Sequence, residues 1–293
     1  MSYTILTDSS CNLPESIIDR YEIEVLPLRF ESDGEEYASY LKGQVTDLST
    51  FYRMMRDGRV FTTSLPALDR AKVIIEGILS AGYDILYIGF SSGLSGTYEA
   101  MRQLVLDMTA EHPGRQALCC DTRSASLGEG LLVLHAARRK QAGEAMESLH
   151  AWLEDARFRL AHWFTVDDLM YLYRGGRVSK TSAFAANILS IKPVLHMDDP
   201  GHLVPVEKVR SRRRSIEALW RHMKKTFDHS LAPQTIAISH GDCLEDAHAL
   251  IDIIKGDEEL AIDDIVLNCI DPVIGAHSGP GTLALFYLAT TRD

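Results

Sequence analysis

The segment that decides the fold is residues 85–97, ILYIGFSSGLSGT, in which an apolar run passes into a loop of glycines and hydroxyl side chains. The run Ile85–Phe90 predicts a buried strand, and the pattern that starts at Thr97 predicts a helix directly after the loop. In open α/β sheets, ligands bind at the carboxyl ends of the strands, and the free N–H groups at the start of a helix favour an anion. The loop is therefore a candidate binding site, although the same serines also fit a plain helix cap.

The same alternation of short apolar runs and longer amphipathic segments extends along the chain and predicts an α/β fold. Further strands are predicted at Tyr3–Thr7, Glu24–Phe30, Gln116–Cys120, Arg159–Phe164, Pro193–Met197, Thr235–Ser239, Ile265–Cys269 and Leu283–Ala289. Further helices are predicted from an Asn12–Glu15 capping box to Tyr21, and at Thr46–Arg56, Asp69–Ala81, Leu127–Lys140, Glu144–Asp155, Val166–Tyr173, Ser215–Phe227 and Leu244–Lys255. The series restarts near residue 157, so we predict two α/β domains, 1–157 and 158–293.

The composition excludes several classes of protein. The 293 residues include 30 Lys and Arg against 41 Asp and Glu, a formal net charge of −11, which gives no overall attraction for nucleic acid or an anionic membrane. The five cysteines lack CxxC spacing, so neither a disulfide framework nor a zinc site is indicated. Asp8 interrupts any signal-peptide core and no long apolar stretch follows, so we expect a cytoplasmic protein without a stable membrane anchor.

Four loops rich in glycine and hydroxyl residues are candidates to carry chemistry: Thr62–Pro66, Ser91–Thr97, Arg174–Ser179 and His277–Thr282. The second includes GFSSG, a match to the G-x-S-x-G nucleophile elbow in a strand-to-helix context. A serine hydrolase would use Ser91, His277 and a carboxylate, which would come from Asp242 or Asp271. No HGGG-type oxyanion segment lies upstream, so the hydrolase remains the alternative interpretation.

Neither a nucleotide nor a metal site is predicted. The segment RGGRVSKT at 174–181 has Ser179 where a Walker motif needs glycine before its lysine, and 128–133 lacks the third glycine of a dinucleotide fingerprint. The best metal constellation is His240, Asp242 and His248, which matches no zinc spacing. We therefore expect no cofactor and no metal.

A basic segment stands out in this acidic chain. Residues 207–225 hold eight Lys and Arg against two Glu, and their apolar residues recur at helical spacing. Such a face is either simply solvated or a docking surface for an acidic partner. Nucleic acid is disfavoured, because no aromatic residues are interleaved with the run Arg212–Arg214.

At these loops the sequence resembles the DegV family of bacterial fatty-acid-binding proteins, which includes the carrier subunit of fatty acid kinase. The resemblance rests on six motifs in the family's order: TDSS at Thr7–Ser10, TSLP at Thr63–Pro66, SSGLSGT at Ser91–Thr97, GGRVSK at Gly175–Lys180, IKP at Ile191–Pro193 and HSGPG at His277–Gly281. The match runs from about Thr4 to Leu285. It implies two α/β domains with a long-chain fatty acid between them, and a separate kinase that binds ATP and phosphorylates the acyl group.

The resemblance also implies which residues form the site. Thr63, Ser95 and His277 are expected to hold the carboxylate. The other ligand-binding residues expected from these motifs are Ser64, Ser92, Gly96, Gly279 and Arg210, and those expected to meet the partner are Arg177, Arg212 and Arg213. Leu65 departs from the family, which commonly has glutamine there. In this interpretation the chain carries no catalytic residue and its only bound group is the fatty acid.

Overall fold

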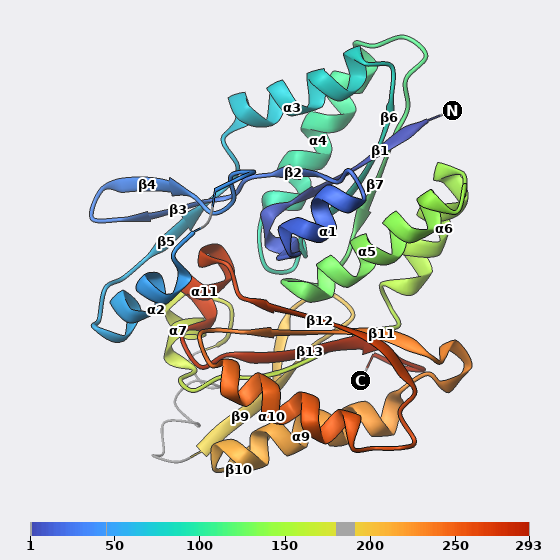
Figure 1. Ribbon diagram of the computed structural model, residues 1–293. Coiled ribbons are helices and arrows are strands. Elements are labelled where there is room, and N and C mark those ends of the chain that lie inside the picture. The colour runs from blue at the N-terminus through green and yellow to red at the C-terminus, as the bar shows by residue number, and fades with distance from the viewer. Residues whose placement is uncertain (1, 45, 180–190, 293) are drawn as a thin grey trace.

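The computed structural model describes residues 2–44, 46–179 and 191–292, and these form three sheets with helices around them (Figure 1). A parallel sheet has the strand order β2 (Glu24–Leu26), β1 (Tyr3–Asp8), β6 (Asp84–Gly89) and β7 (Ala117–Asp121). A mixed sheet has the order β10 (Leu203–Arg210), β9 (Ile191–Met197), β8 (Leu160–Thr165), β13 (Leu283–Leu288), β11 (Gln234–His240) and β12 (Ile262–Cys269). A small antiparallel sheet has the order β4 (Glu35–Ala38), β3 (Arg29–Ser32) and β5 (Thr62–Ser64).

Helices cover both faces of the parallel sheet. The helices of the first half of the chain are α1 (Glu15–Arg20), α2 (Leu48–Arg56), α3 (Leu68–Ser80), α4 (Thr97–Ala110), α5 (Leu127–Gln141) and α6 (Met146–Ala156). Every residue of β6 is buried, and its side chains alternate between two cores. Ile85 packs with residues of α3 and α4, whereas Leu86 packs with residues of α5. A continuous apolar run is therefore a strand buried on both faces, as parallel sheets require.

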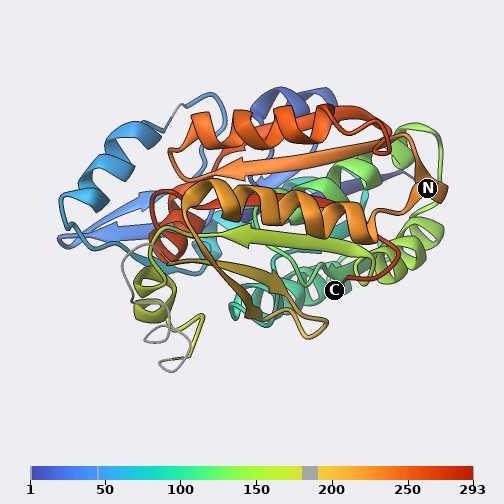
Figure 2. The same ribbon diagram turned by 90° about the horizontal axis from the view of Figure 1, so that it is seen from below.

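The mixed sheet lies between α5 and a second pair of helices. In the described part of the second half, the helices are α7 (Met170–Arg174), α9 (Arg212–Thr226), α10 (Leu244–Lys255) and α11 (Pro272–Ser278). Short 3₁₀ turns lie at Ser9–Cys11 in the first half and at His229–Leu231 in the second. Figure 2 shows α9 and α10 beside each other on one face of this sheet, where Leu219 and Leu250 pack. The other face packs on α5 through Phe286. Because α5 contacts both large sheets, it is buried along most of its length.

The predicted α/β class is confirmed, and several predicted elements change in detail. The predicted strand Glu24–Phe30 is two strands, β2 and β3, in different sheets, because Pro27 has no N–H to donate to a ladder. Thr165 ends β8 instead of capping a helix, since its hydroxyl donates to the carbonyl of Pro193 at 2.7 Å. The elements β4, β5, β10 and α11 were not predicted from the pattern.

Two predicted helix starts are also corrected. Asn12 is in the left-handed region with φ of 55° and ends the first 3₁₀ turn, so the helix begins at Glu15 without a side-chain cap. The cap of α2 is Asp47, which accepts from the N–H of Thr50 at 2.9 Å, and not Thr46. Within the described ranges, none of the helices has both the length and the apolar character of a membrane span.

The contact of α5 with the mixed sheet depends on Gly128. A Cβ at this position would lie 2.7 Å from a ring carbon of Phe286 and would also clash with the hydroxyl of Ser124. We expect Gly128→Ala to lower the free energy of unfolding by about 1–3 kcal/mol, because neither neighbour can retreat in a close-packed interior.

The matched control is Gly77→Ala in α3, where the added methyl meets no atom within 4 Å. It should stabilise the protein by about 0.5–1 kcal/mol through helix propensity alone. Urea denaturation of the two variants measures both effects. Equal stability of Gly128→Ala and the parent would contradict the close packing of α5 on β13.

Candidate functional site

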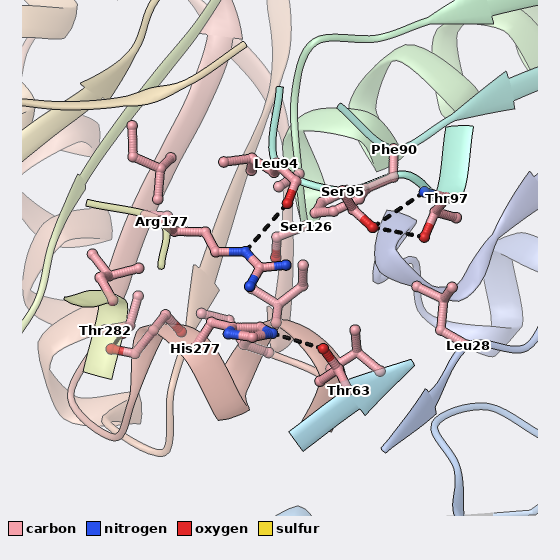
Figure 3. Close-up of a pocket in the computed structure, with 18 of the residues that line it drawn as sticks. Leu28, Thr63, Phe90, Leu94, Ser95, Thr97, Ser126, Arg177, His277 and Thr282 are labelled. Atoms are coloured by element: carbon pink, nitrogen blue, oxygen red, sulfur yellow. Dashed lines mark hydrogen bonds between the residues drawn. The ribbon is translucent and has the colours of Figure 1, made fainter. Parts of the chain in front are cut away.

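A cavity of about 980 Å³, a volume that counts the open space at its mouth, lies between the two halves of the chain (Figure 3). Its walls are mostly apolar, with Leu28, Leu65, Phe90, Leu94, Ala125, Phe164, Leu172, Leu203, Ile270, Val273, Ile274 and Ala284. Its polar lining residues are Thr63, Ser64, Ser95, Thr97, Ser126, His162, Arg177, Ser239, His277, Ser278 and Thr282. A concave apolar site with a few polar groups is the usual form of a small-molecule pocket.

Several polar residues gather at one end of this cavity. The hydroxyl of Thr63, on β5, lies 2.7 Å from Nε2 of His277, on α11. The hydroxyl of Ser95 accepts from the N–H of Thr97 at 3.2 Å and lies 2.9 Å from that residue's hydroxyl. Figure 3 shows the guanidinium of Arg177 extending between these two pairs. The end of the cavity thus offers three hydroxyls, an imidazole and a cation.

His277 is neutral at physiological pH. Burial and, to a smaller extent, the nearby charge of Arg177 lower the pKa of its ring to about 4. Gly175 lies against Nδ1 so closely that any side chain at 175 would clash with the ring. The ring is therefore held in place on both sides, by Thr63 at one nitrogen and by the Gly175 backbone at the other.

Arg177 was expected at a partner surface, and the structure places it in the cavity wall instead. Its Nε donates to the carbonyl of Leu94 at 3.2 Å, and its Nη1 donates to the carbonyl of Gly175. Burial lowers the pKa of the guanidinium, which nevertheless keeps its proton at neutral pH. The GGRVSK motif was the sequence signal for this residue; its Lys180 lies outside the described residues.

Not all the predicted ligand-binding residues reach the cavity. Thr63, Ser64, Ser95 and His277 line it, whereas Ser92, Gly96, Gly279 and Arg210 do not. Ser92 is exposed, and its hydroxyl donates to Asp121 at 2.5 Å.

The other three have structural positions of their own. Gly96 is the exposed residue before α4, and Gly279 ends α11 with φ of 82°, where the ring of Tyr171 leaves no room for a side chain. Arg210 is exposed at the end of β10.

The two arginines expected to meet a partner differ from each other. The side chain of Arg212 is mostly buried. Its Nε donates to Asp246 at 2.8 Å, and its Nη1 lies 3.9 Å from Asp167. The side chain of Arg213 is 88% exposed and is paired with Glu217 on its own helix. Only the second of these arginines faces solvent freely enough to meet another molecule.

The residues of the alternative serine hydrolase do not form a triad. Ser91 is fully buried outside the cavity lining, and its hydroxyl donates to the carbonyl of Gly201 at 2.8 Å. Asp271 accepts from the N–H of Ile274 as the cap of α11, and Asp242 pairs with Arg56. Among the described residues, no three His, Cys, Asp or Glu side chains are grouped so that they could hold a metal ion.

Several polar residues of the cavity were missed from the sequence, namely Ser126, His162, Ser239 and Ser278. His162 and Phe164 stand two apart on one predicted strand, so they had to share a face of the sheet. Which face turns toward the cavity depends on the packing of α5, and no local pattern reveals that.

The fold and this cavity define a class: an α/β protein with a mostly apolar ligand cavity that ends in a cluster of hydrogen-bond donors and one cation. The sequence pattern of the group described as "Uncharacterised protein, DegV family" matches residues 2–290. The chain belongs to the DegV family.

Known members of the family are similar over their whole length. A DegV domain-containing protein of Clostridium perfringens is 37% identical over 291 residues, which covers 99% of each chain. A solved DegV family protein of Thermus thermophilus, described by its fatty acid binding, is 27% identical with a TM-score of 0.86 and coverage of 99% of this chain and 100% of its own. DegV of Bacillus subtilis, described as a fatty acid binding protein, is 26% identical with a TM-score of 0.81 over 99% and 100%.

The cap of α11 generates a prediction about pH. Burial raises the pKa of Asp271 from its ordinary 3.8 to about 7, so the folded protein holds this proton more tightly than the unfolded chain does. The resulting stabilisation is fully present below about pH 4 and is lost as the pH rises toward 7. Asn also caps helices but does not titrate, so Asp271→Asn should gain stability relative to the parent between pH 4.5 and 8.

Asp47→Asn is the matched control, because this exposed cap of α2 has a pKa lowered by the N–H of Thr50. Its pH dependence should have the opposite sign and be small. Chemical denaturation at pH 4.5, 6 and 8 measures both variants. A stability difference between Asp271→Asn and the parent that stays constant over this range would contradict the assignment.

Proposed function

We propose that this protein binds a long-chain fatty acid, with the carboxylate at the polar end of the cavity and the acyl chain along its apolar walls. The observation that carries the proposal is the cluster of Thr63, Ser95, His277 and Arg177 at one end of a mostly apolar cavity. The hydroxyls donate hydrogen bonds to the carboxylate, the neutral imidazole orients the Thr63 hydroxyl through Nε2, and the guanidinium balances the charge.

The energetics suit such a ligand. Each methylene transferred from water into an apolar cavity contributes about 0.8 kcal/mol, so an acyl chain of sixteen or so carbons supplies a large binding energy without any reaction. A carboxylate that was buried without partners would cost several kcal/mol, which is why a dry cavity for a fatty acid needs donors at one end. Arg177 and the two hydroxyls meet that need.

The relatives support the same ligand. The structures from Thermus thermophilus and Bacillus subtilis are described as fatty acid binding, and each matches this chain over nearly its full length. A protein similar to them in fold, with a cavity of this chemistry, is expected to take the same class of molecule.

We further propose that the protein is a cytoplasmic carrier that presents the bound acid to a separate kinase and has no catalytic group of its own. The segment around GGRVSK lacks the glycine that a Walker motif places before its lysine, so ATP is expected to bind to the partner. Ser91 is hydrogen-bonded to the carbonyl of Gly201, and His277 is hydrogen-bonded to Thr63, so the two do not pair as a nucleophile and its base. This supports a carrier over a hydrolase.

The head-group assignment predicts that Thr63→Ala and Ser95→Ala each weaken the binding of hexadecanoic acid by about 1–3 kcal/mol, because each leaves a charged acceptor short of a donor. Binding is measured on delipidated protein by calorimetry. Ser92→Ala is the control, since this hydroxyl is paired with Asp121 outside the cavity. Unchanged affinity in both of the first two variants would remove them from the site.

The carrier role predicts a different result at the outer face of α9. Arg213 and Arg214 are exposed there, so reversing both charges to Glu should slow acyl-phosphate formation by the kinase of the same organism at least tenfold. Fatty acid affinity should not change, because neither side chain lines the cavity. Turnover of ATP by the purified protein without a kinase would contradict the division of labour.

A further inference from the structure

His162 lies on the cavity wall away from the polar end, at a position that the register of the mixed sheet defines. Ser239, Ala284 and Phe164 stand opposite one another on β11, β13 and β8, and all line the cavity. Two residues further along these strands, on the same face of the sheet, His162 stands opposite Phe286. In the other direction Thr282 lies two residues before Ala284, and its hydroxyl donates to the carbonyls of Ser278 and Gly279 at the end of α11.

This register gives a length scale. Thr282 follows the helix that carries His277, and it lies four residues before Phe286, the residue opposite His162. At about 3.3 Å per strand residue, Thr282 and His162 are therefore about 13 Å apart along the sheet. An extended hydrocarbon advances about 1.25 Å per carbon, from bonds of about 1.5 Å at tetrahedral angles. A chain that runs along the sheet with its carboxylate at the level of Thr282 would therefore meet His162 near its tenth carbon.

His162 has unused hydrogen-bonding capacity at this point. Its Nδ1 lies 3.3 Å from the hydroxyl of Ser124, while Nε2 has no hydrogen-bond partner among the residues that the structure describes. The ring is only 5% exposed and is flanked by Phe164 and Phe286, with ring centres 5.5 and 4.5 Å away. Burial lowers its pKa to about 3, so the ring is neutral and has one N–H donor and one acceptor nitrogen.

A second polar group precedes it along the same path. The hydroxyl of Ser239 accepts from Ser126 at 3.1 Å, and its own hydrogen has no acceptor in the described part of the chain. Ser126 has φ of 55°, a strained conformation for a residue with a side chain, and it too lines the cavity. A cavity wall for a purely hydrocarbon tail gains nothing from these groups, because buried polar atoms without partners are costly.

We propose that the cavity prefers a fatty acid with a hydroxyl group near the middle of its chain, recognised by His162 with Ser239 as the neighbouring contact. A chain hydroxyl both donates and accepts a hydrogen bond, which matches the unused hydrogen-bonding groups of a neutral imidazole and a serine. Ser124 accounts for Nδ1 of the histidine, and a chain hydroxyl would account for Nε2. This inference rests on the proposed function, since it assumes that an acyl chain occupies the cavity.

The test compares 10-hydroxyoctadecanoic acid with its isomer 2-hydroxyoctadecanoic acid and with octadecanoic acid on delipidated protein. The two hydroxy acids have the same composition, but only the 10-hydroxyl reaches the level of His162, whereas the 2-hydroxyl stays beside the carboxylate. We expect the 10-hydroxy acid to bind about tenfold more tightly than the 2-hydroxy isomer, the magnitude of a hydrogen bond in a dry site. His162→Leu should remove this preference, and His162→Gln, which keeps a donor and an acceptor, should retain part of it.

His196→Phe is the matched control, because this buried histidine stacks on Trp163 in the same sheet and does not line the cavity. It should keep the preference.

Should His162→Leu fail to fold, Ser239→Ala provides the second variant, with an expected reduction of the preference. Equal binding of the two isomers by the parent, or a preference that survives His162→Leu, overturns the inference. Tight binding of octadecanoic acid in that case leaves the proposed function standing, whereas failure of all three acids to bind contradicts both.

Discussion

The hydrogen bond between Thr63 and His277 joins the two halves of the chain at the polar end of the cavity. Thr63 comes from the small sheet and His277 from the short helix after β12, so neither half has a complete set of donors. A carboxylate in a dry cavity is stable only where several donors converge on it, and this convergence requires the two halves to be packed together. The position of α5 against both large sheets provides that packing.

The burial that closes the cavity also sets the protonation of its groups. His277 and His162 are both neutral because burial lowers the pKa of each ring, to about 4 and about 3. Arg177 stays charged, since a guanidinium resists deprotonation far better than an imidazole. Among the residues that the structure describes, Arg177 is the cation in the cavity wall and the two histidines of that wall are neutral, which suits a monovalent anion.

The sequence was sufficient for the class of fold and for most long elements, because β6 and α10 are encoded in local hydrophobic patterns. It failed at short elements such as β5 and α11, whose three and seven residues carry too little periodicity to be seen. These two elements hold Thr63 and His277, so the site residues could be named only through the family's motifs. Physical pattern alone would have left them in loops.

The same limit applies to the cavity wall. Arg177 was expected to meet a partner because of the family's GGRVSK motif, and only tertiary packing turns it toward the cavity. Ser92 and Gly96 belong to the same motif as Ser95, yet Ser95 lines the cavity and these two residues do not. Adjacency in a motif does not predict which side of a loop a residue faces.

Native mass spectrometry of the protein as purified shows whether a fatty acid occupies the cavity. We expect a mass excess that corresponds to one long-chain fatty acid per chain, which is released on denaturation and reduced in a variant that lacks both the Thr63 and the Ser95 hydroxyl. A protein that carries no lipid, and that fails to take up a fatty acid added in excess, would contradict the proposed function.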